Sequence, residues 1–252
     1  ISGGTVNNAG SLLHSSISAG TLNNTGTITN DVLTMTGGTL RNSSGGNIAT
    51  LNMSGGSVTN AYTTGAASTG TITTANLTGS SAMTNSLGGS ITTLSLANSS
   101  SLNNAGSITG TATLGSSATN TNSGSIATAN VTDGVLNSSG SITTLTSSGD
   151  VVIGNTGTIG NATFGSSGTN TNSGSITTAS LTDGVLNSSG SMTTLTTSGD
   201  SVVSNTGTIG NATFGSSGTN TNSNSITTAS VTDGVLNSSG SINTLTTSGD
   251  SV

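Results

Sequence analysis

The sequence predicts an all-β protein, a single β-solenoid in which a coil of 16–17 residues is stacked about 14 times. Three observations predict this fold. Near-identical segments recur every 50 residues, one Asn and one Ile recur in each coil, and apolar residues lie two positions apart between turn-forming residues. Spacings of two are typical of strands, because successive side chains of a strand point to opposite faces.

The 50-residue period is clearest in the second half of the chain. The segment TDGVLNSSGS begins at Thr132, Thr182 and Thr232, and GNATFGSSGTNTNS begins at Gly160 and Gly210. Within each unit, an apolar residue after a Gly-Ser or Gly-Thr step recurs at intervals of 16, 17 and 17 residues. Each 50-residue unit is therefore interpreted as three coils.

We expect one continuous solenoid over residues 1–252, in which residues 109–252 form the regular 50-residue units. Residues 1–108 are expected to form longer, irregular coils with an insertion near 61–68. The usual right-handed sense of parallel crossovers predicts a right-handed parallel β-helix. The first residue already lies inside a repeat, so we expect the chain to be a fragment of a longer protein.

An Asn precedes the apolar marker in every coil. Asn tolerates the left-handed backbone of turns, and stacked Asn side chains form hydrogen-bonded ladders between parallel strands. The alternative is that each Asn only marks a turn. We predict a structural column formed by Asn8, Asn24, Asn42, Asn60, Asn85, Asn104, Asn122, Asn137, Asn155, Asn172, Asn187, Asn205, Asn222 and Asn237.

The composition excludes several classes of partner. Charged residues make up 3% of the chain and apolar residues 29%, far below the levels of an ordinary globular domain. With a single Lys or Arg, the chain cannot neutralise a phosphate backbone, so we expect no nucleic acid partner. Its negative net charge and the lack of a long apolar run argue against binding to or inserting into a membrane.

Six Asp residues recur in pairs on neighbouring coils. Paired carboxylates can bind Ca²⁺ or act as general acid and base. The pairs repeat three times with no repeated cation or aromatic residue beside them, so we favour a role in turns and expect no enzyme, no catalytic residue and no cofactor. Ca²⁺ remains the alternative at Asp133 with Asp150, Asp183 with Asp200, and Asp233 with Asp250.

A few single residues complete the list of candidates. We expect His14 to lie at the surface, Arg41 to point outward from a strand, and Phe164 and Phe214 to lie in the core. The many Thr residues raise the possibility of ice binding, which needs an outward T-x-T on one side of every coil. We expect pairs such as Thr143-Thr144 to fall at a corner, which makes ice binding a minor alternative.

The units GTLNNTGTI, SLNNAGSI and GNTGTI resemble the passenger repeats of bacterial autotransporter and filamentous-haemagglutinin-like proteins. The resemblance implies a right-handed β-helix that is exported and displayed on the outer membrane, with roles in adhesion, aggregation or biofilm. It implies a partner such as a receptor or glycan on a host or neighbouring cell. It supplies no catalytic residues, and the coils here are shorter than those typical of the family.

Two main functions are therefore expected from the sequence. The first is a surface adhesin or its stalk, in which the solenoid is a rod that holds a binding region away from the cell. The second is an extracellular fibre subunit that associates end to end or side by side. The near-identical 50-residue units favour the fibre, because the strands of stacked solenoid ends can pair with each other.

Overall fold

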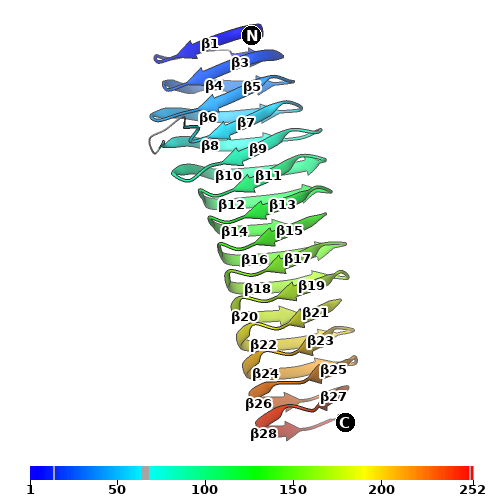
Figure 1. The fold of residues 1–252 in the computed structure, drawn as a ribbon. Helices are drawn as coiled ribbons and strands as arrows, with labels where there is room; N and C mark the ends of the chain where they lie inside the picture. Colours follow the sequence, from blue (N-terminus) through cyan, green and yellow to red (C-terminus); the bar gives the residue numbers. More distant parts are fainter. Residues whose placement is uncertain (14, 64–67, 250, 252) are drawn as a thin grey trace. The chain divides into compact units, whose positions relative to one another are not determined.

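The computed structural model describes residues 1–13, 15–63, 68–249 and 251, and it confirms an all-β solenoid of about 14 turns. No helix occurs among these residues. The chain divides into two compact units, Ile1–Asn130 and Val131–Val252. In each unit the odd-numbered strands form one parallel sheet, here sheet A, and the even-numbered strands form a second parallel sheet, sheet B (Figure 1).

Each turn of Ile1–Asn130 contributes one strand to each sheet. Sheet A of this unit contains β1 (Ser2–Asn8), β3 (Ala19–Asn24), β5 (Thr39–Asn42), β7 (Ser57–Asn60), β9 (Ala82–Asn85), β11 (Ser101–Asn104) and β13 (Thr119–Asn122). Sheet B contains β2 (Ser16–Ile17), β4 (Thr27–Met35), β6 (Gly46–Met53), β8 (Gly70–Leu77), β10 (Gly89–Asn98), β12 (Ser107–Ser116) and β14 (Ser125–Val131), whose last residue begins the second unit.

The unit Val131–Val252 repeats the same plan. Its sheet A contains β15 (Val135–Ser138), β17 (Val152–Asn155), β19 (Thr169–Asn172), β21 (Val185–Ser188), β23 (Val202–Asn205), β25 (Thr219–Asn222) and β27 (Val235–Ser238). Its sheet B contains β16 (Ser141–Gly149), β18 (Thr158–Ser166), β20 (Ser175–Leu181), β22 (Ser191–Gly199), β24 (Thr208–Ser216), β26 (Ser225–Val231) and β28 (Ser241–Thr247).

The core of each turn is a few apolar side chains held between the two sheets. One turn buries Leu22 from sheet A with Ile28, Leu33 and Met35 from sheet B. In these short strands every second side chain points inward, so small apolar residues fill the thin interior while Ser and Thr face outward. Stacked copies bury what one coil cannot bury alone, which explains how a chain with few apolar residues folds.

The predicted core aromatic residues are confirmed, and their neighbours compensate for their size. Phe164 and Phe214 are each 1% exposed. Phe164 is in register with the small Ser147 of the preceding turn, and its own turn carries Ala162 at the adjacent inward position of β18. Alternating large and small side chains in this way keeps the thin core filled without overpacking it.

The two units differ in how evenly their turns are spaced. Along Ile1–Asn130, stacked Asn residues lie 16, 18, 18, 25, 19 and 18 residues apart, and three strand pairs contain register shifts. The interval of 25 residues contains the predicted insertion, of which 64–67 lie outside the described residues, as does His14. In Val131–Val252 the stacked turns keep one register throughout sheet B.

Three turns carry a buried Asn in a core position that is apolar elsewhere. Asn120, Asn170 and Asn220 are 0% exposed, and each lies in a T-N-T-N strand whose pairing with the preceding strand is limited to two residue pairs. The side-chain oxygen of each Asn accepts a hydrogen bond from a backbone N–H of that preceding strand, at 2.9–3.0 Å. The amide therefore satisfies a buried N–H where the sheet pairing is shorter.

Candidate functional site

The most regular arrangement of polar side chains in Ile1–Asn130 is a buried column of Asn. Each Asn donates its side-chain N–H to the side-chain oxygen of the Asn one turn later, at 2.7–2.9 Å. Every member is at most 7% exposed. The column of this unit consists of Asn8, Asn24, Asn42, Asn60, Asn85, Asn104 and Asn122.

Most column members also bond to the backbone of their own turn or of the next one. Asn42, for example, donates to the carbonyl oxygens of Gly46 and Thr71 as well as to Asn60. The amides all point the same way along the column, so their dipoles reinforce one another inside a poorly solvated interior. This arrangement ties every turn to its neighbour at the same corner.

In Val131–Val252 the column is interrupted at every third turn by a Ser. Asn155 donates to Asn172 at 2.8 Å, and Asn172 donates to the hydroxyl of Ser188 at 3.2 Å. The next three turns repeat the pattern with Asn205, Asn222 and Ser238. Ser138 and Ser188 are in register with Asn155 and Asn205, respectively.

The sequence prediction was therefore wrong for Asn137, Asn187 and Asn237, which are exposed on the outer face of sheet A. In the segment V-L-N-S the apolar residue that points inward is Leu136, whereas Val135 lies on the outer side. Moving the alternation by one residue reverses every side chain of a strand, so Ser138 takes the buried position. The adjacent pair Val-Leu was the signal that left both registers possible.

The recurring Asp residues lie at the corners that lead from sheet B to sheet A. The carboxylates of Asp133, Asp183 and Asp233 accept the backbone N–H of the following Gly, which has a positive φ of 71–74°. Asp150 and Asp200 accept hydrogen bonds from Ser167 and Ser217 at 2.8 Å. These are contacts typical of turns.

No group of three or more His, Cys, Asp or Glu that could hold a metal ion occurs in the described part of the chain. Asp250, which was predicted to pair with Asp233, lies outside that part.

The only Arg and the only Tyr of the sequence meet beside the insertion. Arg41 alternates with the buried Leu40 and Asn42 in β5, so it points outward as expected. Its guanidinium carbon lies 4.7 Å from the centre of the Tyr62 ring, within the range of a cation–π contact. Tyr62 follows Ala61, whose positive φ of 58° marks where the chain leaves the regular path.

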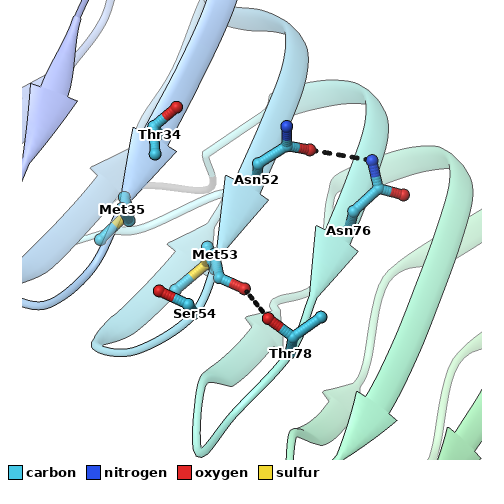
Figure 2. A pocket seen from close by; sticks show the side chains of 7 residues that line it. All are labelled: Thr34, Met35, Asn52, Met53, Ser54, Asn76 and Thr78. Carbon is cyan, nitrogen blue, oxygen red and sulfur yellow. Dashed lines mark hydrogen bonds between the residues drawn. The ribbon is translucent and has the colours of Figure 1, made fainter.

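Figure 2 shows a shallow groove on the outer side of sheet B in Ile1–Asn130. Thr34, Asn52 and Asn76 line it from successive strands, and the amides of Asn76 and Asn52 are joined by a hydrogen bond of 2.9 Å. The hydroxyl of Thr78 donates to the carbonyl oxygen of Met53 at the groove's edge. The groove is lined by uncharged amide and hydroxyl groups together with the side chains of two Met residues.

Sheet B of Val131–Val252 presents a more regular outer surface. In β16 to β26, the side chains directly before and after one buried residue face outward, as Thr144 and Thr146 do around Leu145. Thr144 was expected at a corner with Thr143, but it pairs in register with Asn161 of the next strand of sheet B. These two outward positions hold T-x-T in β16, β22 and β28, N-x-T in β18 and β24, and T-x-S in β20 and β26, so a complete T-x-T does not occur in every turn, as expected.

No helix of the described residues is long and apolar enough to cross a membrane. Comparison of the chain with protein-family models, with curated proteins and with solved structures gave no match. The structure shows a β-solenoid built from tandem repeats.

Proposed function

We propose that the chain is a non-enzymatic structural segment of a bacterial surface adhesin, a rod-like passenger or stalk displayed outside the outer membrane. In this role the stacked turns hold an adhesive region away from the cell. The proposed partner is a receptor or glycan on a host or neighbouring cell, and the proposed outcome is adhesion, aggregation or biofilm formation.

The observation that carries this proposal is the buried hydrogen-bonded column of each unit. Every turn bonds to the next through the same side chain, for instance Asn42 to Asn60 at 2.8 Å. In such a stack each turn contacts only its neighbours, so turns can be added or removed without changing the interior of the others. A stalk needs this property, because its length can then vary while its fold is retained.

The length of the stack gives a direct test. Removal of residues 160–209 joins Ile159 to Gly210 and deletes one 50-residue unit without changing the local sequence. With the chain fused to an outer-membrane anchor and an epitope at its outer end, we expect the epitope to move inward by about 14–15 Å, three strand spacings. Duplication of the unit should move it outward equally, and a height that does not follow the number of turns would contradict the stalk.

The adhesive role is tested separately with the same cells. Cells that display the full chain should aggregate or bind to other cells more than cells that carry only the anchor. Equal adhesion by the two strains would overturn the adhesive part of the proposal. The height measurement would still decide whether the segment is a stalk.

A fibre subunit is the second candidate, because sheet A of Val131–Val252 carries an apolar outer stripe. The stripe consists of Val135, Val152, Val185, Val202 and Val235, and the first four alternate with buried residues of their strands. Thr169 of β19 and Thr219 of β25 pair with Val185 and Val235, so a Thr interrupts the stripe at every third turn. Val152 is 39% exposed. Negative-stain images of filaments much longer than one chain would favour the fibre, whereas short single particles would contradict it.

A further inference from the structure

We propose that the outer face of sheet B in Val131–Val252 binds ice, the surface of crystalline water. This face, here called the threonine array, consists of two columns of outward side chains. The columns are Thr144, Asn161, Thr178, Thr194, Asn211, Thr228 and Thr244, and Thr146, Thr163, Ser180, Thr196, Thr213, Ser230 and Thr246.

The first argument is the regularity of the threonine array. Every step from one turn to the next keeps both columns in register over all seven strands from β16 to β28. Neighbouring members of a column are therefore about 4.7–4.9 Å apart, one strand spacing. The two columns are about 6.6 Å apart, because one inward residue separates them on each strand.

The second argument is that these polar groups are uncommitted. Among the described residues of the unit, none of the fourteen side chains of the threonine array hydrogen-bonds to another protein group. In Ile1–Asn130, by contrast, Asn76 donates to Asn52 at the corresponding face. A hydroxyl or amide that has no protein partner can donate to and accept from an external lattice.

The charge and the chemical groups of the threonine array indicate which ligand it binds. The threonine array contains no charged residue, and the described Asp side chains of this unit hydrogen-bond at the separate corners between the sheets. An uncharged periodic surface is complementary to a neutral periodic ligand. The array has no aromatic ring on which a sugar could stack, so a polysaccharide is disfavoured. The oxygen repeats on a prism face of hexagonal ice are similar in size to both spacings of the array.

The rigidity of the unit supports collective binding. A single Thr contact with water is weak, but seven turns held in one register present all their groups at once. The entropic cost of ordering them has already been met by folding. The methyl group of each Thr adds an apolar contact beside its hydroxyl, so both parts of the side chain can fit an ordered water layer.

The test compares the two faces of the same unit. Thr196→Lys places a long charged side chain in the middle of the threonine array, and Thr171→Lys makes the same change at an exposed Thr on sheet A. The purified full chain, labelled with a fluorophore, is offered to a slowly growing ice hemisphere, and inhibition of ice recrystallisation is measured in parallel. Circular dichroism checks that each variant is folded.

We expect the unmodified chain and Thr171→Lys to enter the ice and slow recrystallisation, and Thr196→Lys to lose both effects. Thr163→Lys, two turns away in the same column, provides a second variant should Thr196→Lys not fold. Exclusion of the unmodified chain from ice would overturn the proposal. Retention of activity by the Thr196→Lys and Thr163→Lys variants would also overturn it, as would equal loss in the sheet A variant.

Discussion

The two units of the chain combine regularity and hydrogen bonding in opposite ways. Ile1–Asn130 has uneven turns and one insertion, yet its Asn column runs unbroken from Asn8 to Asn122. Val131–Val252 has turns of nearly equal length, yet Ser138, Ser188 and Ser238 replace Asn at every third position of the column. Regular sequence and a continuous buried ladder are therefore independent properties of this fold.

This difference teaches which contact allows a solenoid turn to vary in length. Asn60 and Asn85 lie 25 residues apart, against 16–19 for the other neighbours in the column, and the two amides still meet at 2.9 Å. The hydrogen bonds of the column join neighbouring turns at one corner. Extra residues can therefore be inserted at that corner without disturbing the packing of the core. Where the column is weaker, the turns are uniform, and no detour has to be accommodated.

Loss of one amide in the unbroken column should have the largest effect. Asn42→Leu removes the acceptor of Asn24 and the donor to Asn60, which leaves two buried polar groups without their partners. Each such group costs about 1–3 kcal/mol, so the free energy of unfolding should fall by about 2–6 kcal/mol. Urea denaturation followed by circular dichroism measures this loss.

The matched control for that change is Asn103→Leu in β11, where the Asn is exposed. We expect its effect to stay within about 0.5 kcal/mol, as is usual for surface substitutions. If both variants lost the same stability, the buried column would have no special role and the comparison of the units would fail.

The buried Asn residues in core positions should give the second largest effect. Asn170→Val restores the usual apolar residue but leaves the N–H of Ile153 without its acceptor, whereas the hydroxyl of Ser166 loses the bond from Asn170 and keeps its bond with Ser147. One unsatisfied buried N–H predicts a loss of about 1–3 kcal/mol in the free energy of unfolding. Adding Ser166→Ala should recover none of the loss, because the hydroxyl of Ser147 would then lose its acceptor, and a double-mutant cycle measures this.

A stable Asn170→Val variant would show that the shorter strand pairing of β17 and β19 needs no side-chain acceptor. In that case the T-N-T-N strands would be an accident of the repeat. Their recurrence at Asn120, Asn170 and Asn220, with the same bonds each time, argues for the opposite result.

Most of the fold could be predicted from the sequence because the same pattern of Asn, Gly and apolar residues recurs in each coil. The Asn and Ile markers located every turn, and the spacing of apolar residues located both strands. The position of Phe164 in the core followed from its place in that pattern and is confirmed. A single coil of this composition would not have shown which residues form strands and which form turns. The recurrence of the pattern over many coils resolved this ambiguity.

The errors in predicting which side chains are buried arose where the strict alternation of inward and outward residues was ambiguous or broken. At Val135-Leu136 either residue could be taken as the inward one. Taking Val135 as inward predicted Asn137 in the column, where the structure has Ser138. At Thr143-Thr144 the bend between two inward residues hid the outward position of Thr144, and with it the threonine array. Both were decided by strand register, which sequence spacing alone could not determine.

Restoring the column in the second unit should have a smaller effect of opposite sign. Ser188→Asn places an amide between Asn172 and Asn205, where the structure has a hydroxyl that accepts from Asn172 at 3.2 Å. One additional buried hydrogen bond is worth about 0.5–1.5 kcal/mol, so the free energy of unfolding should rise by that amount. A loss of stability would mean that the Ser is required by the space available at this turn.

The smallest expected effect tests the register itself. Asn187→Ala changes an exposed side chain one residue before Ser188, so the free energy of unfolding should change by less than about 0.5 kcal/mol. Asn172→Ala, a column member that bonds to both Asn155 and Ser188, should cost at least about 1–3 kcal/mol for the amide of Asn155 left without its acceptor. The same substitution at two Asn residues, 15 positions apart in one repeat, thus distinguishes a buried column position from an outward position. Equal losses would place Asn187 in the column after all, and the contrast between an unbroken and an interrupted ladder would disappear with it.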